Sequence, residues 1–67
     1  MTLHKAIEEI LKNNSQPMTT QEIADELNEQ DLYQKNDGTE ITRYQVHGRT
    51  RKYQHIFNRD GATVSLV

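Results

Sequence analysis

Two segments of this chain carry the same signature for the start of an α-helix, and this repetition constrains its fold more than any other feature. In each segment a threonine precedes a glutamate or glutamine by three positions, so that the two side chains can cap backbone N–H groups reciprocally. The first capping box is Thr19-Thr20-Gln21-Glu22 and the second is Thr42-Arg43-Tyr44-Gln45. The sequence therefore predicts two helices with well-defined starting points.

Apolar residues around the first box predict how its helix packs. Met18 before the cap and Ile23 after the box form a hydrophobic staple. Ile23, Ala24 and Leu27 then lie on one face at helical spacing. We expect this helix to run to about Gln30.

The second box has the same arrangement, with Ile41 and Val46 as its staple. If Val46 points inward, the residues on its face are Thr50, Tyr53 and Phe57. We expect this helix to end near His55 or Ile56.

An amphipathic helix is also predicted at the start of the chain. Leu3, Ala6, Ile7, Ile10 and Leu11 form a single apolar stripe at helical period. Thr2 can cap this helix, and the run from 13 to 15 followed by Pro17 can end it.

The end of the chain is typical of a β-hairpin. Ile56-Phe57 leads into an Asp-Gly turn within residues 58–61, which places Arg59 in the turn. Residues 63–66 then alternate polar and apolar, so that Val64 and Leu66 would face the core beneath Phe57. The longer link 31–41 contains an Asn-Asp-Gly turn signal at 36–38 and could hold a small strand pairing with this hairpin.

Three helices closed by a hairpin indicate a mainly α fold with a small β-hairpin, a winged helix-turn-helix. With 67 residues and no cysteine, residues 1–67 are expected to form one small domain held by packing alone. The longest apolar run is two residues, which argues against a membrane span or signal-peptide core and favours a cytoplasmic protein.

No pattern for catalysis or cofactor binding is apparent. The serines lack an evident base and no glycine-rich phosphate loop occurs. His47 and His55 are eight residues apart and point in different directions on the third helix, while His4 is remote in sequence, so no metal site is expected. We therefore expect a non-enzyme without cofactor, metal, membrane or small-molecule substrate.

The net charge of −2 hides a division of the chain into two unlike parts. Residues 1–40 carry three lysines against nine acids, a net −6, whereas residues 41–67 carry five cations against Asp60, a net +4. Such asymmetry suggests an anionic partner for the basic part, although attraction between the two parts within one fold explains it equally well.

The third helix presents much of the positive charge on its outer face. Tyr44, Gly48, Arg51 and His55 lie opposite Val46 on the helical wheel. Gln45 and Lys52 flank this face on one side and His47 on the other, with Arg49 nearer the core boundary. The simpler interpretation is a solubilising surface on a chain that is acidic elsewhere.

This face has the chemistry that duplex DNA requires. Arginine can pair with a guanine edge, glutamine with adenine, and lysine with phosphate, and a recognition helix reads bases mainly near its N-terminus. Gly48 would let a groove wall approach closely, at a cost in helix stability. The candidate DNA-binding residues are Arg43, Tyr44, Gln45, Arg51 and Lys52 on the helix and Arg59 in the hairpin, where it would contact phosphate.

Several stretches together resemble the HARE-type helix-turn-helix domain. They are residues 17–24, residues 45–53 leading to Phe57, the strand 64–66 and the opening residues 4–7. The family occurs in restriction endonucleases, chromatin regulators and the delta subunit of bacterial RNA polymerase. The resemblance implies a non-catalytic winged-helix module that brings effectors to double-stranded DNA, including DNA with modified bases, and acts in transcription or DNA recognition.

The delta subunit also suggests an alternative, a protein-interaction module that docks on RNA polymerase or forms a homodimer. The predicted second helix carries acids that duplex DNA would repel: Glu22, Asp25, Glu26 and Glu29. Sequence alone leaves both alternatives open.

Overall fold

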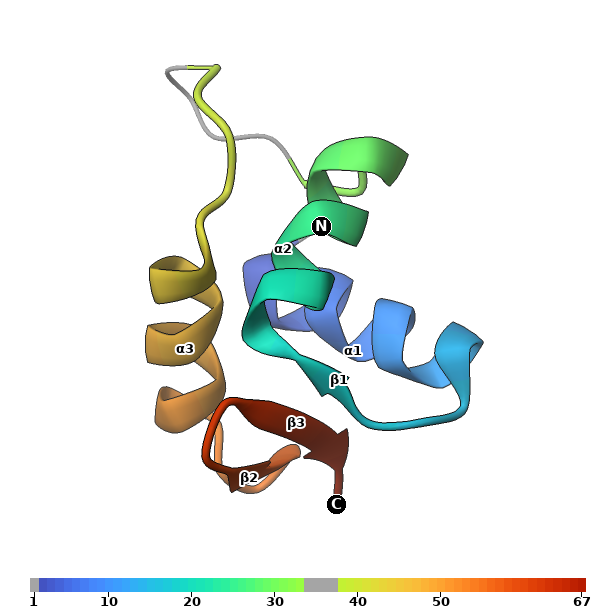
Figure 1. Cartoon of the computed structure of the whole chain (residues 1–67), viewed down its shortest axis with the longest axis vertical. Helices are drawn as coiled ribbons and strands as arrows, with labels where there is room; N and C mark the ends of the chain where they lie inside the picture. The colour runs from blue at the N-terminus through green and yellow to red at the C-terminus, as the bar shows by residue number, and fades with distance from the viewer. Residues whose placement is uncertain (1, 34–37) are drawn as a thin grey trace.

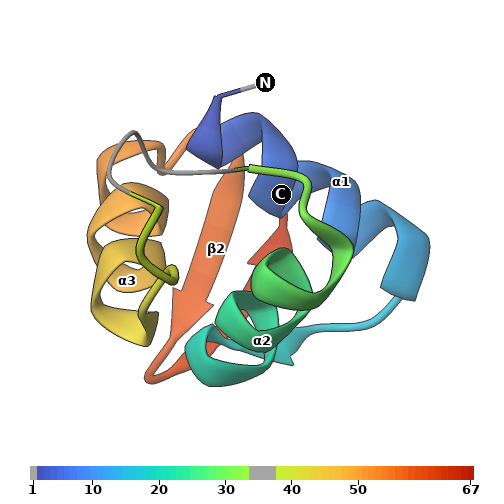
Figure 2. The same cartoon turned by 90° about the horizontal axis from the view of Figure 1, so that it is seen from above.

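A computed structural model describes residues 2–33 and 38–67 of the chain. Within them, three helices and three strands follow one another in the order α1, β1, α2, α3, β2, β3. Their bounds are α1 Leu3–Asn14, β1 Met18–Thr19, α2 Thr20–Gln30, α3 Arg43–Lys52, β2 Phe57–Asp60 and β3 Thr63–Leu66. Figure 1 shows the hairpin of β2 and β3 beneath the helices, and Figure 2 shows α3 and α1 on opposite sides of the molecule. The mainly α fold with a small β-hairpin is confirmed.

The strands form one antiparallel sheet in the order β1-β3-β2. β3 is the central strand because Val64 pairs with Met18 on one side and with Arg59 on the other. Val64 and Phe57 are buried in the core, and Leu66 packs against it partly buried. The alternation predicted for the last strand is therefore correct.

Helix α1 supplies the largest share of the core. All five residues of its apolar stripe, Leu3, Ala6, Ile7, Ile10 and Leu11, are buried. Thr2 caps the helix by accepting a hydrogen bond from the Lys5 N–H, and Ser15 ends it in the left-handed conformation at φ 60°. Both ends lie where the sequence predicts them.

Both predicted capping boxes are present. The Thr19 hydroxyl accepts from the Glu22 N–H at 3.1 Å while the Glu22 carboxylate accepts from the Thr19 N–H at 2.9 Å. Thr42 and Gln45 form the matching pair at the start of α3, with 3.4 Å and 2.8 Å for the corresponding bonds. Each box thus satisfies two backbone donors that the first turn of a helix leaves unpaired.

A side-chain clamp joins α2 to the segment that leads into α3. The Asn28 amide donates to the Ile41 carbonyl at 2.9 Å and accepts from the Ile41 N–H at 2.8 Å. Ile41 is buried, so its backbone groups need such partners. This clamp fixes the position of the α3 staple, and it has no local signal in the sequence.

Helix α3 ends earlier than predicted, at Lys52 rather than near His55 or Ile56. Tyr53 leaves helical conformation at φ −110° and ψ 58°, and its ring stacks on His4 of α1 with the centroids 4.0 Å apart. The turn that follows is closed by the Phe57 N–H donating to the Tyr53 carbonyl at 3.2 Å. Phe57 thereby reaches the core as the first residue of β2, which a longer helix would prevent.

The third strand of the described sheet does not come from the link 31–41, which the sequence suggests could hold one. It is β1, immediately before α2, and Met18 therefore serves both as a staple residue and as a strand residue. Residues 38–41 of the link are not in a strand. Of the predicted Asn-Asp-Gly turn, Asn36 and Asp37 lie outside the described residues.

The hairpin turn is also shifted by one step from its predicted position. β2 continues through Asp60, so the loop is Gly61-Ala62, and Gly61 adopts a positive φ of 63° that favours glycine. Arg59 consequently lies within strand β2, not in the turn.

Candidate nucleic-acid interface

Helix α3 carries its charge where water can reach it. Arg43, Arg51 and Lys52 are exposed and Arg49 is half-buried, while only Val46 and Thr50 of the helix are buried. Three of these cations lie in the last turn, where they also interact favourably with the helix dipole. The helix thus exposes cations at its first residue and in its last turn.

The first turn of α3 presents an arginine and a tyrosine together. Tyr44 is 70% exposed, an unusual position for a large aromatic side chain. The Arg43 Nη2 donates to the Tyr44 hydroxyl at 2.9 Å, and the guanidinium carbon lies 4.9 Å from the centre of the ring. Each side chain holds the other in place at the end of the helix that would enter a groove.

Gln45 has a structural partner that bears on its predicted pairing with adenine. It is half-buried, and its Oε1 accepts the Thr42 N–H in the capping box. A bidentate contact with adenine needs both the oxygen and the nitrogen of the amide. In this conformation only the Gln45 nitrogen remains for such a contact.

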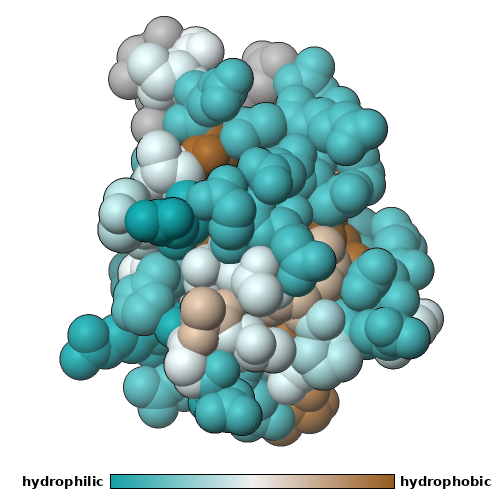
Figure 3. All heavy atoms as spheres, in the orientation of Figure 1, coloured by the Kyte–Doolittle hydropathy of each residue, from teal (hydrophilic) through white to brown (hydrophobic). Residues whose placement is uncertain are grey.

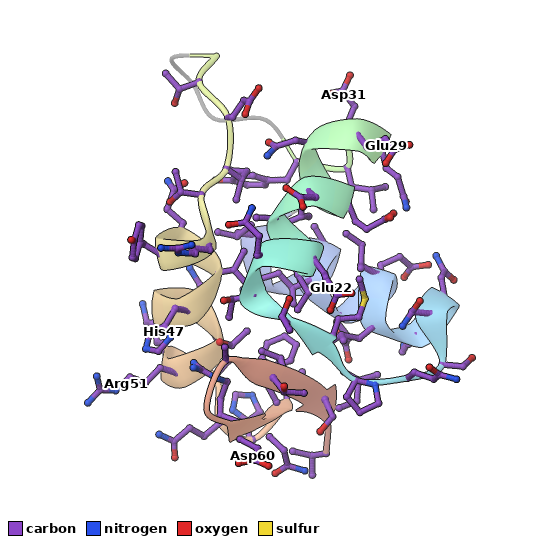
Figure 4. All side chains as sticks on the ribbon, in the orientation of Figure 1. Glu22, Glu29, Asp31, His47, Arg51 and Asp60 are labelled. Carbon is purple, nitrogen blue, oxygen red and sulfur yellow. The ribbon has the colours of Figure 1, made fainter. Side chains whose placement is uncertain are left out.

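Arg51 and Lys52 occupy different parts of the exposed helix surface. Arg51 projects from α3 on the same side as His47, one turn away (Figure 4). It borders an open hollow of about 460 Å³ lined by His47, Arg51, Gln54, Phe57, Asn58 and Arg59. The Lys52 ammonium lies 5.8 Å from the centre of the Tyr53 ring.

Gly48, also exposed, has nothing within 4 Å of the position that a Cβ would take.

Arg59 extends from β2 toward α3. Its Nη1 donates to the Thr50 hydroxyl at 3.3 Å and weakly to the His47 carbonyl at 3.4 Å. Its Nη2 donates to the Gly61 carbonyl at 2.6 Å and contacts His47 Nδ1 at 2.8 Å. Both Nη nitrogens therefore have partners within the chain, and the phosphate contact predicted for Arg59 stays a prediction.

His47 is not among the site residues that the sequence predicts, yet it lies between the two hollows beside α3 and contacts Arg59. It is exposed on α3, contacts Arg59 and borders two hollows of the surface. Helical spacing places it only on the flank of the outer face. Its contact with Arg59 joins residues twelve positions apart in different elements, for which the sequence gives no signal.

The hairpin turn, the start of α2 and the start of α3 converge beside this helix. The Thr20 N–H donates to the Ala62 carbonyl at 2.9 Å, which ties the turn to α2. An open hollow of about 500 Å³ lies between them, lined by Thr19, Thr20, Gln21, Arg43, Tyr44, His47 and Ala62. Figure 3 shows paler, weakly polar surface over the start of α2 and the hairpin turn, bordered by hydrophilic side chains. The hollow gives a concave surface with the cationic helix on one side.

Four acidic side chains lie on α2. Glu22 and Glu29 are on α2 in Figure 4, whereas His47 and Arg51 point outward from α3. Glu22, Asp25 and Glu29 are exposed, and Glu26 is half-buried. The four acids of α2 and the four cations of α3 therefore lie on different helices, although Asp25 and Glu40 line one hollow together with Arg43 and Tyr44.

Two further features bear on the kinds of site that the chain could contain. In residues 2–33 and 38–67, no three histidine or acidic side chains are grouped so that they could hold a metal ion. The helices of the same ranges are too short and too polar for any of them to span a bilayer.

The order of elements, the antiparallel hairpin after α3 and the exposed cationic third helix define a winged helix-turn-helix. The profile of one family of such domains, HARE-HTH, described as a helix-turn-helix domain of ASXL proteins and restriction endonucleases, matches residues 1–67. The chain belongs to this HARE-HTH family. Membership indicates a helix-turn-helix DNA-binding module, of a kind not typically catalytic. No curated protein and no solved structure matches the chain significantly.

Proposed function

We propose that residues 1–67 form one non-catalytic domain that binds duplex DNA through α3, in transcription regulation or in recognition of DNA with or without modified bases. The observation that supports this most is the exposed cationic face of α3 beside the hollow formed with α2 and the hairpin turn. Family membership supports the same class of partner.

In this proposal the position of a residue along α3 determines whether it contacts bases or phosphates. Arg43, Tyr44 and Gln45 in the first turn meet base edges, because a recognition helix reads bases mainly from its N-terminal residues. Arg51 and Lys52 in the later turns meet phosphates and set the orientation on the duplex. Arg59 supports the helix from the wing and adds positive charge near the backbone.

An amide-shift titration with short duplexes at two salt concentrations tests the proposal. Shifts should concentrate in α3 and around the hairpin turn and should weaken as salt rises, because phosphate binding releases counterions. Absence of shifts in the α3 amides at low salt would show that the proposal is wrong.

Lys52→Ala sharpens this test. The substitution should weaken binding to all sequences and lower the slope of log affinity against log salt by about one unit. Lys12→Ala, which removes an exposed lysine from α1, is the matched control and should leave the slope unchanged.

The exposed carboxylates of α2 favour a second candidate, docking on a protein such as RNA polymerase or on a second copy of the chain. Duplex DNA would be repelled by this surface, whereas a basic protein surface would be attracted. Light scattering after size exclusion, with capture by purified polymerase, tests it. A strict monomer that binds DNA and not polymerase eliminates this candidate.

A further inference from the structure

The contact between Arg59 and His47 determines which form of the histidine ring is present. An arginine side chain has only donors, so His47 Nδ1, at 2.8 Å from Arg59 Nη2, must accept. A protonated ring has no acceptor, and the alternative neutral ring carries its hydrogen on Nδ1. The contact therefore selects the neutral His47 ring with its hydrogen on Nε2.

The rest of the Arg59 network holds this arrangement in place. Thr50 is buried and its hydroxyl donates to the Val46 carbonyl at 2.9 Å, so the same hydroxyl oxygen is free to accept from Arg59 Nη1. The Gly61 carbonyl fixes the other end of the guanidinium. Arg59 is thus oriented from both α3 and the hairpin turn, and its Nη2 is directed at the imidazole.

The remaining hydrogen of the ring belongs to an exposed side chain. Nε2 lies across the ring from Nδ1, and no acceptor for it occurs in residues 2–33 and 38–67. His47 projects from α3 on the side of Arg51 (Figure 4) and borders the hollow that also contains Arg43 and Tyr44. It is therefore a neutral donor of fixed direction inside the surface assigned to DNA.

We infer that His47 is a further DNA-reading residue and that Arg59 is its positioning residue. The inference rests on the proposed DNA binding: the Nε2–H donates to an acceptor atom of the duplex. A location within the first two turns of α3 favours the edge of a purine, whose N7 accepts in the major groove, over a phosphate oxygen. Arg59 acts through the histidine and makes no direct contact with base edges.

The state of the ring can be measured in the free protein, independently of DNA. Nitrogen-detected imidazole spectra at about pH 8, where histidines are ordinarily neutral, should show His47 with the hydrogen fully on Nε2. His55, exposed and outside the Arg59 network, provides the averaged reference in the same spectrum. In Arg59→Lys the His47 signals should move toward those of His55. A hydrogen on Nδ1, or no response to R59K, would overturn the positioning role.

DNA affinity tests the reading role. His47→Ala should weaken binding about three- to tenfold, the effect of losing one hydrogen bond, with the salt slope unchanged because no charge is lost. His47→Gln should recover most of the affinity, since its amide can donate near the position of Nε2. Wild-type affinity in H47A, or a change in its slope like that of K52A, would contradict the inference.

Arg59→Lys separates positioning from simple charge. It keeps the positive charge of the wing but loses the fork that reaches Nδ1, Thr50 and Gly61 together. We expect R59K to bind DNA as weakly as H47A, and the double variant H47A/R59K to lose little more, because both changes remove one coupled unit. Unchanged affinity in R59K would show that Arg59 contributes only charge and would overturn its positioning role.

Duplexes in which 7-deazapurines replace the purines identify the acceptor. The ratio of wild-type to H47A affinity should fall to about one on them, because N7 is absent while every phosphate remains. A ratio that persists would assign the acceptor to phosphate and overturn the base-edge assignment. If wild-type protein binds no duplex, the proposed function fails together with the reading role, whereas the ring spectra still decide the role of Arg59.

Discussion

Helices α2 and α3 begin in the same way but are held in the fold by different means. Each starts with a capping box, yet α2 buries Thr20, Ile23, Ala24 and Leu27 and α3 buries only Val46 and Thr50. Helix α2 is therefore stabilised mainly by the core. Helix α3 depends more on polar contacts at its ends and sides, which leaves most of its surface available to a partner.

The largest expected effect on stability comes from removing a core side chain from α2. Leu27 is fully buried, so Leu27→Ala should lower the free energy of unfolding by about 3 kcal/mol, a large fraction for so small a chain. Urea denaturation followed by circular dichroism measures this. Leu32→Ala makes the same change at a half-buried position and should cost clearly less. Equal losses would show that α2 is not anchored by its apolar face.

The clamp between the helices should have the next largest effect. Asn28→Ala leaves both backbone groups of buried Ile41 without their partner and should cost about 2 kcal/mol. Asn13→Ala, at an exposed position of α1, is the matched control for urea denaturation and should be nearly neutral. If both variants unfold at the same urea concentration, the clamp contributes nothing to stability.

Loss of the Thr19 cap and loss of the Thr42 cap should destabilise different regions of the fold. Thr19→Ala and Thr42→Ala should each cost about 1 kcal/mol, the usual value for a capping threonine. Amide hydrogen exchange should show protection lost mainly within α3 for T42A and more broadly for T19A, because α2 shares more of the core. Identical exchange patterns in the two variants would argue against this distinction.

The smallest expected effect is at Gly48. Space around it is open, so Gly48→Ala should stabilise α3 by about 0.5–1 kcal/mol. If duplex DNA approaches this part of the helix closely, the same variant should bind DNA more weakly. Thermal unfolding and affinity measured side by side would then move in opposite directions, whereas unchanged affinity would place Gly48 outside the contact.

Local patterns predicted most of the fold. The stripe of α1, both capping boxes and the alternation around Val64 depend on spacing within a few residues, and each is present. The four residues predicted as staples are all buried. The predictions were wrong where contacts between residues distant in sequence determine the local structure. Tyr53 leaves α3 to stack on His4, and Met18 forms the outer strand because β3 returns beside it.

The same distinction applies to the candidate site. Helical spacing placed Tyr44, Arg51 and Lys52 on the exposed surface of α3, where the structure also has them. It could not show that the Gln45 oxygen is used in the cap or that Arg59 contacts His47. Both facts concern which partner a particular side-chain atom binds. A pattern of residue types along the sequence does not show this.

Because of the clamp between Asn28 and Ile41, the position of α3 does not depend on the length of the chain between α2 and α3. Because the clamp fixes where the chain rejoins the core, added residues between them need only close a larger loop. Doubling a flexible loop costs only about 0.6 kcal/mol in closure entropy. The connection is therefore a place where evolution or engineering can insert a segment, such as a reporter or a second binding element, while α3 keeps its position.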